Sequence, residues 1–159
     1  MGTIGGSLAN SDPAACYPAA VLGLGATIHT NKRSIAADSF FLGLYETALD
    51  EGEIITAVSF PVPEKAGYVK FKNSASRFAL VGAFVSKGSQ GVRVAVTGAG
   101  SCAFRATALE TALAASWTAA ACNAVKMSAD TLNGDLHASA EYRAHLIPVI
   151  AGRAAAAAK

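Results

Sequence analysis

The chain has 159 residues, of which 52% are hydrophobic and only 15% are charged, and its formal net charge is +2. A chain of this length buries roughly two thirds of its unfolded surface, enough for one domain or two small lobes. The small charge, with no basic cluster longer than Lys32-Arg33, argues against a nucleic-acid-binding protein. No segment approaches the ~20 apolar residues of a membrane-spanning helix, so we predict no membrane span.

The cysteines and histidines do not form a recognisable site. Cys16, Cys102 and Cys122 are far apart and contain no CxxC pair, which argues against both a zinc site and a disulfide framework. The three histidines are also scattered, so we predict no metal site. An odd number of cysteines, and opening residues unlike a signal peptide, predict a cytoplasmic protein.

The opening residues contain two adjacent glycines, Gly5 and Gly6, flanked by the hydroxyls of Thr3 and Ser7. A loop without side chains approaches a ligand closely, and its exposed amides suit an anionic phosphate. Asp12-Pro13 is typical of a helix start, because Asp accepts hydrogen bonds from the first amides and Pro suits the first helical position. The pattern predicts a glycine loop that binds phosphate, although Gly-Gly pairs that merely turn the chain are far commoner.

An apolar helix followed by short strands is expected in the rest of the first sixty residues. Ser39 is expected to cap a short helical turn. Pro61 and Pro63 interrupt any strand ladder and form a stiff connector, so we place a domain boundary between residues 1–61 and 62–159. The expected ranges are helix 18–24 and strands 26–30, 34–37 and 54–60.

Strands followed by helices, without βαβ alternation, predict an α+β fold for the whole chain. In the stretch 68–72 the alternation is expected to direct Lys70 and Lys72 to one face and the aromatic side chains to the other. Pro148 is expected to kink the last helix. The expected strands are 68–72, 79–87 and 92–97, with a hairpin turn at 88–91, and the expected helices are 107–115, 116–123 and one from residue 139.

Three further patterns have alternative interpretations. Gly98-x-Gly100-x-x-Ala103 matches a nicotinamide-binding fingerprint, but no parallel strand follows, and a structural strand-to-helix turn is the better interpretation. Cys102 lies near an expected helix start and is either a nucleophile or, more simply, a small buried residue. Asp135 and Glu141 form either a carboxylate pair or a helix cap with a first-turn acid. We assign no catalytic residue from these patterns.

The motif Thr3-Ile4-Gly5-Gly6-Ser7 resembles the second FAD-binding motif of the medium subunit of molybdenum hydroxylases. This family includes xanthine dehydrogenases and aerobic carbon monoxide dehydrogenases, and the latter branch is the more similar. Its members begin with another glycine-rich subdomain, so the resemblance implies that this chain corresponds to the later part of such a subunit. Further similar stretches follow in the family's order at 12–15, 17–20, 53–58, 68–73, 75–82 and 139–143.

The resemblance implies the second lobe of a two-lobed FAD domain followed by a small C-terminal domain of antiparallel sheet and helices. It implies FAD as cofactor, a molybdenum-containing large subunit and a 2Fe-2S small subunit as partners, and oxidoreductase function through electron transfer. Cys16 stands where many relatives have an aspartate that contacts the flavin, and a thiol is a poorer acceptor. The implied cofactor-binding residues are Thr3, Ile4, Gly5, Gly6, Ser7, Asp12, Cys16, Ile55 and Lys72.

Two functional hypotheses remain open. The first is a partial FAD-binding subunit that relays electrons, with Lys72 facing the flavin ring and weak FAD binding by the chain alone. The second is a truncated, non-catalytic interaction module that binds no FAD by itself. The scarcity of charged residues also predicts self-association, such as a homodimer through the surface around Gly5 and Gly6.

Overall fold

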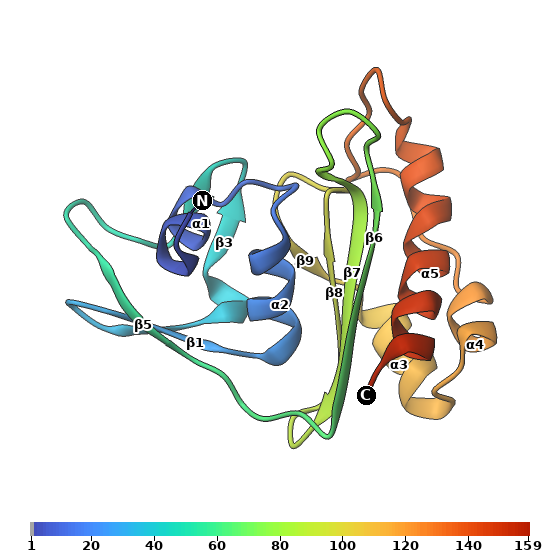
Figure 1. Ribbon diagram of the computed structural model, residues 1–159, viewed down its shortest axis with the longest axis horizontal. Coiled ribbons are helices and arrows are strands. Elements are labelled where there is room, and N and C mark those ends of the chain that lie inside the picture. The colour runs from blue at the N-terminus through green and yellow to red at the C-terminus, as the bar shows by residue number, and fades with distance from the viewer. Residues whose placement is uncertain (1) are drawn as a thin grey trace.

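The structure is a computed structural model that describes residues 2–159 and shows an α+β fold, as expected (Figure 1). A smaller sheet and two helices form one side, and a four-stranded sheet with three helices forms the other. The helices are α1 Ile4–Asn10, α2 Cys16–Leu24, the 3-10 helix η1 Ala37–Ser39, α3 Thr107–Ala115, α4 Ala119–Asn123 and α5 Ala140–Ala157. The strands are β1 Thr27–Thr30, β2 Ser34–Ala36, β3 Phe41–Gly43, β4 Glu46–Thr47, β5 Ile55–Ser59, β6 Lys65–Lys72, β7 Ala79–Gly88, β8 Gly91–Thr97 and β9 Phe104–Arg105.

The smaller sheet has the antiparallel order β2-β1-β5. Its central residue Ile28 is fully buried and pairs with Ile35 on one side and Val58 on the other. These side chains share a core with Leu8 of α1 and Phe40 after η1. The short hairpin β3–β4 lies beside this core, and η1 ends at Ser39 instead of being capped by it.

The larger sheet has the order β6-β7-β8-β9, and every neighbouring pair is antiparallel. Its core against the helices contains Val81, Val94 and Ile147, all fully buried. Helix α2 packs against the opposite face of β7 and β8. An antiparallel sheet is incompatible with a Rossmann fold. The Gly98–Ala103 segment connects the antiparallel strands β8 and β9, so the prediction of a strand-to-helix turn was wrong, because the short strand β9 precedes α3.

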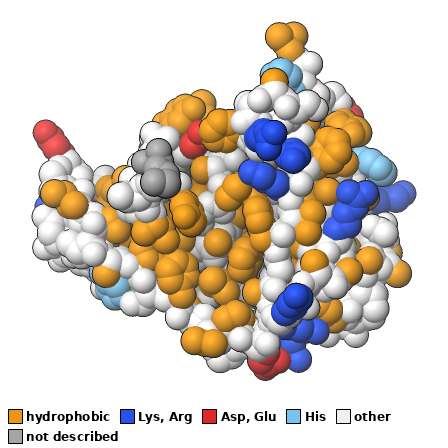
Figure 2. All heavy atoms as spheres, viewed as in Figure 1, with side chains coloured by type: hydrophobic (Ala, Val, Ile, Leu, Met, Phe, Trp, Pro, Cys, Tyr) orange, Lys and Arg blue, Asp and Glu red, His pale blue; other side chains and the backbone are white. Residues whose placement is uncertain are grey.

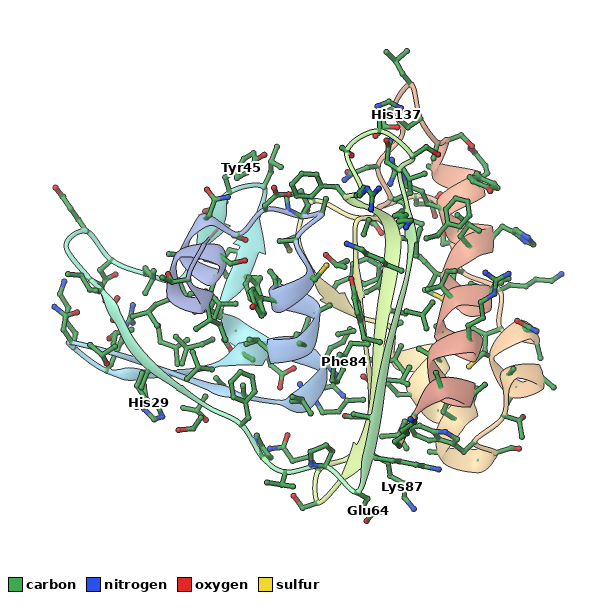
Figure 3. The ribbon with its side chains drawn as sticks, in the orientation of Figure 1. His29, Tyr45, Glu64, Phe84, Lys87 and His137 are labelled. Atoms are coloured by element: carbon green, nitrogen blue, oxygen red, sulfur yellow. The ribbon has the colours of Figure 1, made fainter. Side chains whose placement is uncertain are left out.

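A close contact between α2 and β7 explains one glycine of the sequence. Phe84 points from β7 toward α2 (Figure 3), and a Cβ atom at Gly23 would lie 2.5 Å from its ring. The buried Ser86 hydroxyl donates a hydrogen bond of 2.7 Å to the Gly23 carbonyl. Helix α2 therefore packs closely on the large sheet because residue 23 has no side chain.

The long helix α5 begins as predicted, with the Ser139 hydroxyl accepting a hydrogen bond from the Tyr142 amide. It continues through Pro148 to residue 157. Leu146 and Ile150 are buried in the large core, whereas Tyr142 is exposed and packs edge-on against Phe71 of β6. No helix among residues 2–159 is long and apolar enough to cross a membrane.

Candidate functional site

A hollow of about 400 Å³ lies between the start of α1 and the segment that enters β5. Four residues proposed from the sequence line it together, although they come from segments fifty residues apart. These are Thr3, Gly5, Gly6 and Ile55; the remaining lining residues are Ala9, Leu49, Glu53 and Ile54. Ile4 and Ser7 belong to the same helix but are not part of this lining.

The two glycines form the first turn of α1, so the prediction of a glycine loop was wrong. Thr3 is the N-cap: its hydroxyl accepts a hydrogen bond from the Gly6 amide, and its carbonyl accepts one from the Ser7 amide, both of 3.0 Å. A side-chain cap offsets part of the roughly 1 kcal/mol per residue by which glycine disfavours a helix. The turn therefore forms while its surface stays free of side chains.

The glycines keep the hollow open. A Cβ atom added at Gly5 would lie 3.9 Å from the Ile55 side chain, an ordinary contact, so a larger residue there would fill the hollow instead of breaking the fold. At Gly6 the added atom would lie 3.1 Å from the Thr3 hydroxyl and would crowd the cap. Because the first turn of α1 has no side chains at Gly5 and Gly6, the hollow has room for part of a dinucleotide cofactor such as FAD.

Glu53 supplies a fixed negative charge on the same wall, and the sequence reasoning assigned it no role. Its carboxylate accepts hydrogen bonds from the Arg33 guanidinium at 3.1 Å, the Asp50 amide at 2.8 Å and the Thr30 hydroxyl at 2.6 Å. These donors, Arg33 foremost, lower the pKa of Glu53 to about 2. The side chain is therefore ionised and held in place, and only the tertiary structure brings its donors together.

A second group of residues lies where α2 meets β6, and it contains one of the proposed residues, Cys16, together with Lys70. Cys16 is the first residue of α2, and its sulfur lies 3.4 Å from the Lys70 ammonium. The N-cap, Ala15, offers no side-chain acceptor. Asp12 precedes the helix and accepts a 2.8 Å hydrogen bond from the Ala14 amide, so it organises a turn; the prediction that α2 starts at Asp12-Pro13 was wrong.

Strand β6 directs its side chains differently from the prediction. Tyr68 packs with Phe84 toward α2, on the same side as Lys70, whereas Phe71 packs against α5. The aromatic side chains of β6 are thus split between its two faces. Burial raises the pKa of Tyr68, whose hydroxyl has no hydrogen-bond partner among the described residues. Lys70 is the lysine that meets Cys16, while Lys72 is exposed at the end of the strand.

The other patterns are structural. Gly98 has φ +83° and its amide donates a 2.6 Å hydrogen bond to the Pro13 carbonyl. The Cys102 thiol lies 3.8 Å from the Phe41 carbonyl, and burial raises its pKa, which disfavours a nucleophilic thiolate. Asp135 pairs with the buried Arg143 at 2.7 Å. Within residues 2–159, no three His, Cys, Asp or Glu side chains group as metal ligands.

Comparison with known proteins defines the class to which this architecture belongs. Residues 1–63 match the family described as FAD binding domain in molybdopterin dehydrogenase. The carbon monoxide dehydrogenase medium chain of Afipia carboxidovorans is 38% identical over 54% of this chain and 32% of its own length. The nicotine 6-hydroxylase medium subunit of Paenarthrobacter nicotinovorans is 34% identical over 92% of this chain and 56% of its own length.

The structure gives the same assignment. Reconstituted CO dehydrogenase from Oligotropha carboxidovorans superposes with a TM-score of 0.84 and 29% identity, over 97% of this chain and 59% of that one. The chain is homologous to the FAD-binding medium subunits of molybdenum hydroxylases, which confirms the resemblance seen in the sequence. It spans between a third and three fifths of the length of these relatives.

Proposed function

We propose that this chain is part of the FAD-binding medium subunit of a carbon monoxide dehydrogenase-type molybdenum hydroxylase. In this proposal the subunit relays electrons from iron–sulfur clusters through FAD to an external acceptor. Its partners are a molybdenum-containing large subunit and a 2Fe-2S small subunit. Bound FAD supplies the redox chemistry, and the protein supplies binding and orientation.

The observation that carries the proposal is the common lining of the hollow by Thr3, Gly5, Gly6 and Ile55. Three of these residues belong to the opening motif, and Ile55 belongs to the separate stretch 53–58 that also resembles the family. Because Gly5 and Gly6 have no side chains, the cofactor could approach the backbone closely there. Ile55 would pack against the apolar part of the cofactor. Thr3 would hold the turn in place through its cap.

The second group would contact the cofactor at the junction of α2 and β6. We propose that Lys70 contacts the cofactor in addition to Lys72. Lys70 is on β6, and its ammonium lies beside Cys16, the first residue of α2. Ile4, Ser7 and Asp12 would act by shaping the α1–α2 segment. The division of the chain into two domains, residues 1–61 and 62–159, remains part of the proposal. The contact between α2 and β6 would lie between these two domains.

Titration of the chain with FAD, followed by quenching of flavin fluorescence, tests the proposal. We expect weak but saturable binding that Gly5→Leu abolishes by filling the hollow. Gly134→Val, on an exposed loop far from the hollow in sequence, is the matched control and should bind as the unmodified chain does. Absence of saturable binding, with a folded protein, would favour the non-catalytic interaction module instead.

A further inference from the structure

A spacious pocket lies away from the proposed FAD site, beside the first half of α5. It has a volume of about 520 Å³ and is formed by one side of α5 and the segment that follows α4. That segment leaves α4 and returns to the start of α5 at the opposite edge of the molecule from α1 (Figure 1). The volume lies within the range of small-molecule sites.

The walls of this pocket are mainly apolar, and polar side chains stand at its margin. Val125 and Met127 line it from the segment after α4, and Pro148 and Val149 line it from α5. The polar residues of the lining are Asn123, Lys126, Glu141 and His145. An apolar body of the size of one or two fused rings would therefore contact hydrocarbon on the apolar side of this open pocket.

Pro148 gives the pocket a specific polar feature. In an α-helix the amide of residue 148 donates to the carbonyl of residue 144, and proline has no amide hydrogen. Ala144 and Pro148 both line the pocket, so the interrupted hydrogen bond lies in its wall. No side chain or loop amide of residues 2–159 donates to the Ala144 carbonyl, and Ala144 is 7% exposed. Loss of the usual helical donor therefore leaves acceptor capacity on a carbonyl of a largely buried residue, and such capacity is costly to leave unused.

We propose that this pocket binds a small, largely apolar ring compound that carries one hydrogen-bond donor, which it directs to the Ala144 carbonyl. The ring replaces water against Val125, Met127 and Val149, and the donor satisfies the acceptor that Pro148 leaves free. The site is independent of the FAD proposal, because it shares no lining residue with the hollow at α1.

The experiment compares two probes of nearly the same shape that differ in the donor, indole, which has a ring N–H, and benzofuran, which has a ring oxygen in its place. Each is titrated into ¹⁵N-labelled protein while backbone amide shifts are recorded. We expect shifts at residues 123–129 and 141–149, and about fivefold tighter binding of indole, the factor that one ordinary hydrogen bond contributes. Equal affinities, shifts elsewhere or no binding of either probe would overturn the proposal.

Two variants test the mechanism separately. Pro148→Ala restores the helical amide donor, so it should retain the pocket but remove the preference for indole; a preference unchanged in Pro148→Ala would contradict the role of the carbonyl. Val149→Trp should fill the pocket and abolish binding of both probes, and retained binding would show that the probes bind elsewhere. The amide spectra of both variants report whether they are folded.

Discussion

Arg93 and Asp38 join strand β8 of the large sheet to the 3-10 helix η1, with the guanidinium of Arg93 2.7 Å from the Asp38 carboxylate. Arg93, on β8, also donates two hydrogen bonds to the carbonyl of Leu22 at the end of α2. Arg105 of β9 contacts the same carboxylate at 3.3 Å and pairs with Glu110 at 2.6 Å. The first sixty residues are thus attached to the large sheet through a partly buried network of charges, in which Arg93 is buried and Asp38 is partly exposed.

Arg93→Met should lower the free energy of unfolding by about 2 kcal/mol, because the Leu22 carbonyl and Asp38 both lose a charged donor. Urea unfolding measures this. Lys87→Met is the matched control: its partner Glu64 is 3.3 Å away and both side chains are about half exposed or more, so little change is expected. Equal effects of the two substitutions would show that the network contributes no more than an exposed ion pair.

Acid should destabilise the protein through Glu53, whose pKa falls from an ordinary 4.5 to about 2 in the folded chain. A depressed carboxyl pKa contributes stability that is present above pH 4.5 and is lost as the pH falls toward 2. Thermal unfolding between pH 6 and pH 2.5 should therefore show a falling Tm. In Glu53→Gln the curve should be flatter and its high-pH value lower. An identical pH dependence in both proteins would exclude this assignment.

Cys16→Asp should strengthen FAD binding by on the order of 1 kcal/mol, about fivefold in Kd, by supplying a charged acceptor at the start of α2. The structure adds a reason, since the new carboxylate would lie beside the Lys70 ammonium and be held by it. Flavin fluorescence quenching measures the change. The double variant Cys16→Asp/Lys70→Met should lose part of the gain, and a full gain without Lys70 would show that the pair does not cooperate.

Self-association should involve the face around Gly6. Figure 2 shows hydrophobic side chains over much of the surface between the small sheet and β6, and extended apolar patches usually mark interfaces. Sedimentation at about 100 μM should detect a dimer, and Gly6→Trp should weaken it. A dimer indifferent to Gly6→Trp would place the contact elsewhere, and a strict monomer would refute the prediction.

Local patterns predicted most of the secondary structure. The range of α3, the hairpin of β7 and β8, and the Ser139 cap of α5 follow from periodicity, turn glycines and capping, which depend on residues close in the chain. The error at Gly5 and Gly6 has the same origin, because glycine disfavours a helix locally. The Thr3 cap and packing of Leu8 into the small core outweigh that preference.

The sequence by itself determined the α+β class and the resemblance to FAD-binding medium subunits, because these depend on short ordered stretches. Only the tertiary structure decided that Thr3 and Gly5 share a hollow with Ile55 and Glu53, and that Lys70 is the lysine beside Cys16. Such contacts join residues up to 54 positions apart. The packing of α2 on the large sheet and the register of β6 fix them, and neither is encoded in a local pattern.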